Sequence, residues 1–361
     1  MKKNNVLIMA GGTGGHVIPA ISVARELMLK GYEVHWLGSV KGIENDLVPD
    51  AGYTLHRITV SGLRGNGLLK TLLAPWQLLR AMWQTLNVFF RVRPVMALGM
   101  GGFASGPGGL MAVLSRTPLV IHEQNAIPGM TNKLLSKFAK PLLQAFDGAF
   151  DKTTDLVTVG NPVRPNIVNI SAPKERLQDR AEGLNVLVVG GSLGAVAINN
   201  VLIETMANIP PSVAVNVWHQ TGTRNFDDVK AGYEQHNISS VKVAAFIADM
   251  AEAYEWADIV ICRSGALTVS ELMSAGVASI LVPYPYAVDD HQTANGMFLV
   301  NAGAAILKAQ SDFTSEYLQE EFNQLLQSRE RILNMSIAAR GLAKHDSAKT
   351  VANYCIEAAH G

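Results

Sequence analysis

Short apolar runs that end in glycine-rich or polar turns recur along this chain. Residues 6–10 run into the turn 11–16, and an amphipathic stretch follows at 20–29. Residues 185–206 repeat that order in the middle of the chain. A short apolar run bounded by turn residues is typical of a buried strand, and apolar positions at helical spacing are typical of an amphipathic helix. The pattern predicts an α/β protein with two similar doubly wound domains, each built on a parallel sheet.

The other apolar runs predict more strands and helices in the same alternation. The expected strands cover residues 33–37, 55–60, 94–98, 119–121, 157–159, 213–219, 241–246 and 259–261. The expected later helices cover residues 251–257, 313–326, 329–342 and 345–360. Residues 160–165 read Gly-Asn-Pro-Val-Arg-Pro, and we expect the domain break there because two prolines stiffen a crossing segment.

The stretch 68–90 is apolar beyond a single helical face. One stripe of it contains Leu72, Trp76, Leu79, Trp83, Leu86 and Phe90, and Pro75 lies near the expected start. Two interpretations fit this stripe: it faces a core, or it rests on an anionic membrane surface as an interfacial helix. Both remain open on the pattern alone.

Charge is unevenly distributed, although the formal net charge of the whole chain is +0. Residues 51–122 contain no Asp or Glu. The basic residues of the same interval are Arg57, Arg64, Lys70, Arg80, Arg91, Arg93 and Arg116. A basic field beside apolar surface suggests an anionic partner, such as a membrane surface, a pyrophosphate or a nucleic acid.

Composition narrows the class of protein. The chain has 361 residues, of which 48% are hydrophobic and 17% charged, so it can bury substantial cores. Its two cysteines, Cys262 and Cys355, cannot build a disulfide framework, which fits a reducing compartment. We expect no membrane-spanning helix, because no apolar run reaches the ~18 residues that a span needs.

The stretch 257–271, Ala-Asp-Ile-Val-Ile-Cys-Arg-Ser-Gly-Ala-Leu-Thr-Val-Ser-Glu, carries the clearest chemistry. A strand that turns through Ser-Gly into a helix aims unpaired N–H groups and the positive end of a helix dipole at one point, which suits a diphosphate. Arg263 at the strand end can neutralise a leaving phosphate, and Glu271 can accept hydrogen bonds from a ribose diol. The alternative is an ordinary β-turn-α joint without a ligand.

Two more glycine loops lie in the first half of the chain. Residues 11–16, Gly-Gly-Thr-Gly-Gly-His, form a second candidate anion site, and His16 at its edge could take a proton from a hydroxyl or merely hydrogen-bond a phosphate. Residues 99–106 contain a G-x-G-x-x-A pattern, and Glu123 follows at the end of the next expected strand. That outline also fits a dinucleotide-binding loop, so a nicotinamide-dependent oxidoreductase is an alternative.

The order of these motifs resembles the MurG family of bacterial peptidoglycan glycosyltransferases along the whole chain. The matching segments are C-R-S-G-A-L-T-V-S-E at 262–271, D-D-H-Q-T-A-N at 289–295, G-G-T-G-G-H at 11–16, H-E-Q-N at 122–125, G-N-P-V-R at 160–164 and F-I-A-D-M at 246–250. The resemblance implies a GT-B fold. It implies an N-terminal acceptor and membrane-facing domain at 1–163 plus 344–361, and a C-terminal UDP-sugar domain at 164–343.

The resemblance also implies an activity. It is inverting transfer of N-acetylglucosamine from UDP-N-acetylglucosamine (UDP-GlcNAc) to the C4 hydroxyl of the muramyl sugar of lipid I, which forms lipid II. The enzyme would lie peripherally on the cytoplasmic face of the cell membrane, against an anionic leaflet, with room for contacts to other cell-wall synthesis and division proteins. No nucleic acid and no cofactor are implied. No D-x-D pair is evident, so we predict no essential metal for binding UDP.

Site residues follow from the same motifs. The candidate catalytic bases are His16 and Glu123, and the choice between them stays open. The residues implied to contact UDP-GlcNAc are Thr13, Gly14, Gly15, Asn125, Arg164, Ser192, Ile247, Arg263, Ala266, Leu267, Thr268, Val269, Ser270, Glu271 and Gln292. The acceptor's diphosphate is assigned to the loops that contain Gly11, Gly12, Gly101 and Gly102. Leu193 departs from the glutamine that the family pattern has there, which removes an amide contact.

Three alternatives remain besides glycosyl transfer. One is the oxidoreductase described above. The second is a UDP-GlcNAc epimerase of the same fold, which would need no basic apolar face. The third is a membrane-docking carrier of nucleotide sugars without catalysis.

Overall fold

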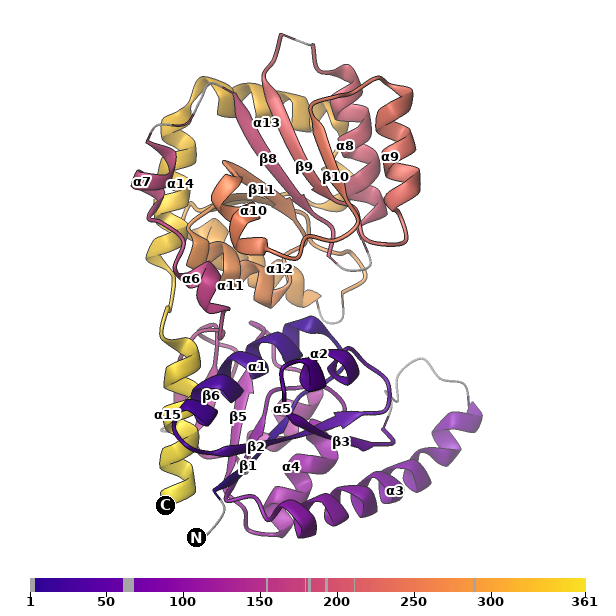
Figure 1. Cartoon of the computed structure of the whole chain (residues 1–361), viewed down its shortest axis with the longest axis vertical. Coiled ribbons are helices and arrows are strands. Elements are labelled where there is room, and N and C mark those ends of the chain that lie inside the picture. The colour runs from indigo at the N-terminus through magenta and orange to yellow at the C-terminus, as the bar shows by residue number, and fades with distance from the viewer. Residues whose placement is uncertain are drawn as a thin grey trace. The chain divides into compact units, whose positions relative to one another are not determined.

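The structure is a computed structural model, and it describes two compact units. The described residues are 4–60, 68–153, 155–178, 180, 183–191, 194–210, 212–287 and 290–361, and side chains are described for all of them except 68–74. Unit 1 comprises Met1–Arg164 with Lys344–Gly361, and unit 2 comprises Pro165–Ala343 (Figure 1). Each unit is described by itself below.

Unit 1 is built on a seven-stranded sheet in which every described pairing is parallel. Its strands are β1 (Asn5–Met9), β2 (Glu33–Ser39), β3 (Thr54–Ile58), β4 (Met96–Gly99), β5 (Leu119–Glu123), β6 (Leu142–Gln144) and β7 (Leu156–Thr158). They lie in the order β3-β2-β1-β4-β5-β6-β7. The order reverses between β1 and β4, and in open α/β sheets ligands bind beyond the carboxyl ends of the strands at such a switch point.

Helices cover both faces of this sheet. They are α1 (Gly14–Leu29), α2 (Glu44–Asp50), α3 (Leu68–Val92), α4 (Ser105–Leu114), α5 (Met130–Leu135) and α15 (Ser347–His360). Alternate residues of β1 serve different cores: Ile8 packs with Leu27 and Val351 of α1 and α15, whereas Leu7 packs with Phe89 of α3. The alternation follows from the two-residue side-chain period of a strand.

Unit 2 repeats this architecture with a six-stranded parallel sheet. Its strands are β8 (Leu184–Val189), β9 (Val215–Gln220), β10 (Val241–Ala244), β11 (Ile259–Cys262), β12 (Ala278–Leu281) and β13 (Ala305–Leu307), in the order β10-β9-β8-β11-β12-β13. Its helices are α6 (Pro165–Val168), α7 (Pro173–Leu177), α8 (Val196–Asn208), α9 (Phe226–Gln235), α10 (Met250–Trp256), α11 (Ala266–Ala275), α12 (His291–Asn301), α13 (Ser315–Gln327) and α14 (Arg329–Gly341), with a 3₁₀ turn η2 (Gln310–Asp312). The switch point lies between β8 and β11.

The predicted fold class, two doubly wound parallel-sheet domains, is confirmed. Element ends differ by one to a few residues; the strand expected at 241–246, for example, ends at Ala244. The expectation that Pro75 lies near a helix start is wrong, because α3 begins at Leu68 and Pro75 lies inside it. The structure also contains elements that were not predicted, namely α2, α4, α5, α6, α7, α9, α12, β6, β12 and β13. Segments as short as α5 or β6 hold too few apolar positions to show a period.

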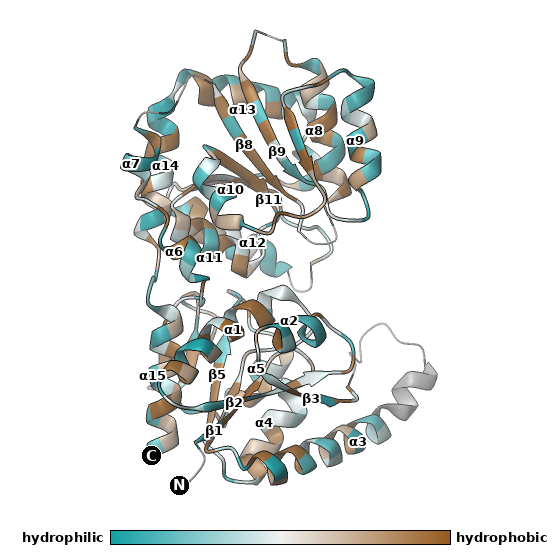
Figure 2. Ribbon diagram, in the orientation of Figure 1, coloured by the Kyte–Doolittle hydropathy of each residue, from teal (hydrophilic) through white to brown (hydrophobic). Residues whose placement is uncertain are grey.

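The apolar stripe of α3 does not face the core in its described part. Trp76, Leu79, Trp83 and Phe90 are 73%, 62%, 66% and 68% exposed, and we call these four residues the apolar face of α3. The opposite side of the helix, with Ala81 and Thr85 fully buried, packs onto the unit instead. Figure 2 shows hydrophobic and hydrophilic segments alternating along the helix. Of the two interpretations of the stripe, the geometry therefore favours an outward-facing surface.

Candidate functional site

The first glycine loop joins β1 to α1 at the switch point of unit 1. Thr13 is the N-cap of α1, and its carbonyl accepts a hydrogen bond from the His16 N–H at 3.1 Å. The Thr13 hydroxyl lies 3.4 Å from His16 Nδ1. His16 is half-buried on the first turn of the helix.

A second glycine loop, after β4, packs directly against the first one. Gly101 and Gly102 have φ of 90° and 85°, which favours glycine. A Cβ at Gly101 would lie 2.7 Å from His16 Cδ2, and one at Gly102 would collide with the backbone of Gly11. The structure therefore brings the predicted acceptor-loop glycines and His16 together, and the glycines are needed for close approach of one loop to the other.

Glu123, the other candidate base, is held by four hydrogen bonds. Its Oε1 accepts from the Asn125 N–H and side-chain amide at 2.9 and 3.1 Å, and its Oε2 accepts from Gly129 N and Asn132 Nδ2 at 3.1 and 2.8 Å. The side chain is 2% exposed. A carboxylate with both oxygens occupied and almost no exposure would have to break internal bonds before it could take a proton from a substrate or bind a ribose.

The neighbouring His122 is fully buried on β5. Its Nε2 donates to the Gly160 carbonyl at 2.9 Å, which leaves Nδ1 to accept from Gln124 Nε2 at 3.3 Å. Burial lowers the pKa of His122 below its usual value, against the opposing effects of the Gly160 carbonyl and Glu123. We conclude that His122 is a neutral, buried histidine whose hydrogen bond connects β5 to Gly160. The polar side chains at the end of β5 therefore point mainly into the protein.

In unit 2 the predicted nucleotide turn joins β11 to α11. Gly265 is the N-cap of α11 and has no side chain with which to cap the helix. Ala266, Leu267 and Thr268 form the first turn, where N–H groups have no partner within the helix itself. Val269 differs, because it is fully buried and its N–H donates to the Gly265 carbonyl at 2.9 Å. The positive dipole end of α11 makes this first turn a suitable position for an anion.

Glu271 lies one turn into α11 and is 5% exposed. The Tyr254 hydroxyl of α10 donates to its Oε2 at 3.0 Å. Burial, reinforced by the charge of Glu271, raises the pKa of the adjacent Cys262 thiol to about 12. The thiol therefore stays neutral and has no nucleophilic role, while Tyr254 fixes the carboxylate that is assigned to the ribose.

Arg263 directly follows β11, and its guanidinium is turned toward the residues after β12. Its Nη1 donates to the carbonyls of Val282 and Pro283, both at 3.0 Å, and its Nη2 donates to Gln310 Oε1 at 2.6 Å. Burial is the main cause that lowers the pKa of this arginine from its ordinary value. These hydrogen bonds hold the guanidinium beside the turn, near the ends of the strands. A cation in this position suits a phosphate, and the same hydrogen bonds also give Arg263 a structural role.

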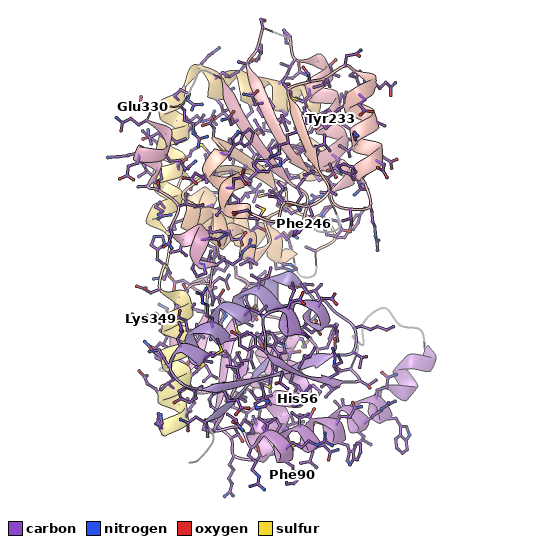
Figure 3. The ribbon with its side chains drawn as sticks, in the orientation of Figure 1. His56, Phe90, Tyr233, Phe246, Glu330 and Lys349 are labelled. Carbon is purple, nitrogen blue, oxygen red and sulfur yellow. The ribbon has the colours of Figure 1, made fainter. Side chains whose placement is uncertain are left out.

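The remaining predicted contacts are distributed over both units. Ile247 is 4% exposed just after β10, beside the exposed Phe246 that Figure 3 labels. Gln292 accepts from the Tyr284 N–H at 2.8 Å, so its amide is oriented by the chain. Arg164 ends the first segment of unit 1, one residue beyond the domain boundary expected from the sequence. Ser192 and Leu193 lie outside the described residues.

Pattern reasoning missed several residues that shape these sites. Glu44, Tyr254, Asn132 and Gln310 each hold a predicted site residue or its loop through a side-chain hydrogen bond. None of the four carried a usable signal in the sequence, and α5, which contains Asn132, was itself too short to predict. In the described part of the chain, no group of three or more His, Cys, Asp and Glu side chains is arranged to hold a metal ion.

Comparison with known proteins identifies relatives for both units. Residues 6–144 match the family model described as Glycosyltransferase family 28 N-terminal domain, and residues 185–351 match Glycosyltransferase family 28 C-terminal domain. The chain is 51% identical over 359 residues to the UDP-N-acetylglucosamine–N-acetylmuramyl-(pentapeptide) pyrophosphoryl-undecaprenol N-acetylglucosamine transferase of Marinobacter nauticus, covering 99% of each chain.

Solved structures agree with this assignment. The crystal structure of Acinetobacter baumannii MurG superimposes with a TM-score of 0.85 and 38% identity, covering 98% of this chain and 99% of that one. The UDP-GlcNAc 2-epimerase of Neisseria meningitidis superimposes with a TM-score of 0.67 over 98% of this chain and 100% of that one, but at 12% identity it shares the fold alone. The two-unit architecture is therefore the GT-B fold.

Proposed function

The chain belongs to the MurG family of glycosyltransferases, and from that premise we propose that it makes lipid II for bacterial peptidoglycan. It transfers N-acetylglucosamine from UDP-GlcNAc to the C4 hydroxyl of the muramyl sugar of lipid I. The observation that carries the proposal is 51% identity to the M. nauticus transferase over 99% of both chains. The epimerase interpretation gains no comparable support, because the likeness to the epimerase is one of fold only. The oxidoreductase interpretation gains no comparable support either.

The donor nucleotide is assigned to the turn between β11 and α11. The amino end of α11 supplies a positive dipole end for the diphosphate, and Arg263 adds a cation beside it. Glu271, oriented by Tyr254, accepts hydrogen bonds from the ribose hydroxyls. Ile247 meets the uracil edge through its backbone, and Gln292 contacts the sugar. Arg164, Ser192, Thr13, Gly14, Gly15 and Asn125 complete the donor contacts expected from the resemblance.

His16 is proposed as the general base. It removes the proton from the muramyl C4 hydroxyl as that oxygen attacks the anomeric carbon of the donor. The bond from the anomeric carbon to the diphosphate breaks in the same step, UDP leaves on the opposite face, and a β-linkage forms. His16 is preferred over Glu123 because the imidazole is only half-buried, whereas four hydrogen bonds occupy both oxygens of the carboxylate.

The reaction itself provides the first test. Purified protein, labelled UDP-GlcNAc and lipid I should give labelled lipid II with a β-linked disaccharide, identified by NMR. Incubation with UDP-GlcNAc alone should give neither an epimerised sugar nor accelerated UDP release. An epimerised product would support the epimerase instead. UDP release at one rate with and without lipid I would support a carrier, and saturable NADH binding without UDP binding would support an oxidoreductase.

The acceptor lipid implies a membrane surface, and we assign it to the apolar face of α3 at the cytoplasmic side of the membrane. Arg80 and Arg91 are exposed on the same helix, and α4, which packs against α3, exposes Leu114. Next to α4 lies α5, and Phe138, three residues after the end of α5, is also exposed. Figure 3 labels Phe90 on α3. Exposed aromatic residues between arginines are typical of a helix that rests in an anionic interface. No helix in the described residues has the length and apolarity needed to cross a bilayer.

Vesicle binding tests this membrane surface. We expect Trp83→Gln to reduce the fraction of protein bound to vesicles with anionic lipid roughly 10-fold, because burying a large apolar side chain in the interface stabilises binding by about 1.5–3 kcal/mol. Leu29→Gln is the matched control, since Leu29 is 70% exposed on α1, away from this face. Equal binding by Trp83→Gln and the control would remove α3 from the membrane surface.

A further inference from the structure

A buried glutamate occupies the first glycine loop of unit 1. Glu44, the first residue of α2, is fully buried. Its Oε2 accepts from the Gly12 N–H at 2.9 Å. Its Oε1 accepts from the N–H and the hydroxyl of Ser39 at 3.0 and 2.7 Å. A carboxylate in the interior is stabilised only where donors surround it, so this one lies in a site that the chain has built for an anion.

Three glycines leave the space for this side chain. A Cβ at Gly11 would lie 2.5 Å from Glu44 Oε1, and a Cβ at Gly38 would lie 2.8 Å from Glu44 Cγ. A Cβ at Gly42 would also collide with the carboxylate. The three positions come from different parts of the chain: Gly11 follows β1, Gly38 lies within β2 and Gly42 precedes α2. All three lie close to the Glu44 side chain. We therefore treat Glu44 as an integral part of the loop.

The same loop carries His16, and two other side chains hold its flanks. Trp36 Nε1 donates to the Ala10 carbonyl at 2.8 Å. The Ser105 hydroxyl lies 2.8 Å from the carbonyls of both Met9 and Gly101. Glu44 is the charged member of this set and the one that binds the loop between Gly11 and the start of α1. Loss of its bond frees the Gly12 N–H one residue before Thr13, the N-cap of the helix turn that bears the imidazole.

We propose that Glu44 is a positioning residue for glycosyl transfer, which holds the glycine loop so that the His16 imidazole meets the acceptor hydroxyl. The inference rests on the proposed function, with His16 as the base. It has a second consequence: because the Gly12 N–H already serves a carboxylate, an acceptor diphosphate at this loop would be repelled there and must take its hydrogen bonds from other groups.

The test compares three variants of the full-length enzyme with UDP-GlcNAc and lipid I. Glu44→Gln keeps the shape but puts an NH₂ group against an N–H donor, either that of Gly12 or that of Ser39. Glu44→Asp keeps the charge but is one methylene shorter. Asp46→Asn makes the same charge change at an exposed residue of the same helix turn and serves as the control.

We expect Glu44→Gln to lower kcat roughly 10- to 100-fold, because a buried donor is left unpaired, with the KM for UDP-GlcNAc within about twofold of normal. Glu44→Asp should retain more kcat than Glu44→Gln, and Asp46→Asn should match the unaltered enzyme. A residue that only filled space would give the reverse order, since glutamine is the better isostere. That order, a normal kcat in Glu44→Gln, or an effect confined to KM would overturn the proposal.

Ser39→Ala covers the case in which Glu44→Gln does not fold. It removes one of the three hydrogen bonds and should lower kcat roughly 3- to 10-fold at unchanged donor KM. A normal kcat in Ser39→Ala would then refute the positioning role. Absence of transfer by the unaltered enzyme would instead refute the proposed function, so the two failures are distinguishable.

Discussion

Two strand-turn-helix joints of this protein share one backbone design and differ in what fills them. The β1–α1 joint of unit 1 and the β11–α11 joint of unit 2 both lie at the switch point of a parallel sheet. At the first joint, the Gly12 N–H donates to the chain's own Glu44. At the second joint, the N-cap residue is Gly265, which has no side chain with which to cap the helix, and Glu271 lies one turn further in.

A glycine loop before a helix is therefore not sufficient evidence that the loop binds an anionic ligand. Both loops have the N–H groups and the dipole end that attract negative charge. In unit 1 that attraction is satisfied internally, which leaves the joint free to position His16. In unit 2 we propose that the amino end of α11 binds a nucleotide diphosphate. We therefore assign proton transfer to the first joint and donor binding to the second.

The largest expected effect comes from removing the imidazole at the first joint. His16→Ala should lower kcat about 10²- to 10⁴-fold, the usual contribution of a positioned general base, while the affinity for UDP stays normal. Steady-state turnover with lipid I and calorimetry with UDP measure the two quantities. His236→Ala, at an exposed histidine of unit 2, is the control. Near-normal turnover in His16→Ala would transfer the role of base to another group.

An intermediate effect is expected at the second joint. Glu271→Gln should weaken UDP binding roughly 10- to 100-fold, because hydrogen bonds to a charged group contribute about 1.5–3 kcal/mol. Glu44→Gln, the corresponding change at the first joint, should leave UDP affinity unchanged. Calorimetry with UDP compares the two variants directly. Equal losses of affinity in both would erase the distinction between the joints.

The smallest expected effect concerns the support of Glu271. Tyr254→Phe deletes the 3.0 Å hydrogen bond to its Oε2, and we expect UDP affinity to fall roughly 5-fold, which corresponds to about 1 kcal/mol. Tyr233→Phe is matched to it, since it deletes a 2.9 Å hydrogen bond to His219 in the same unit, remote from the joint in the sheet order. A stronger effect of Tyr233→Phe on UDP affinity would show that the loss reflects stability alone.

The fold was readable from the sequence because its signal is repeated. Buried strands such as β1 and β8 are continuous apolar runs that end in glycines, and the repetition of that unit predicted two similar domains. The outward stripe of α3 was not decidable, because helical spacing of apolar residues is the same whether the stripe meets a core or an interface. Only burial in the structure separates the two cases.

The candidate sites were predictable only in part. Residues within one turn, such as Arg263 and Glu271, stand out because local sequence places them at a strand end and a helix start. Glu44 and Tyr254 gave no signal, since their roles depend on hydrogen bonds to residues 32 and 17 positions away. Partnerships of that kind are set by how the strands pair, which a single sequence does not specify.

The most direct test of this division between the joints is a crystal structure of the protein with UDP-GlcNAc bound. We expect the diphosphate to lie at the amino end of α11 and the ribose hydroxyls to lie within hydrogen-bond distance of Glu271. The hydrogen bond from the Gly12 N–H to Glu44 should remain intact. A diphosphate bound at the Gly12 N–H, with Glu44 displaced, would contradict this division.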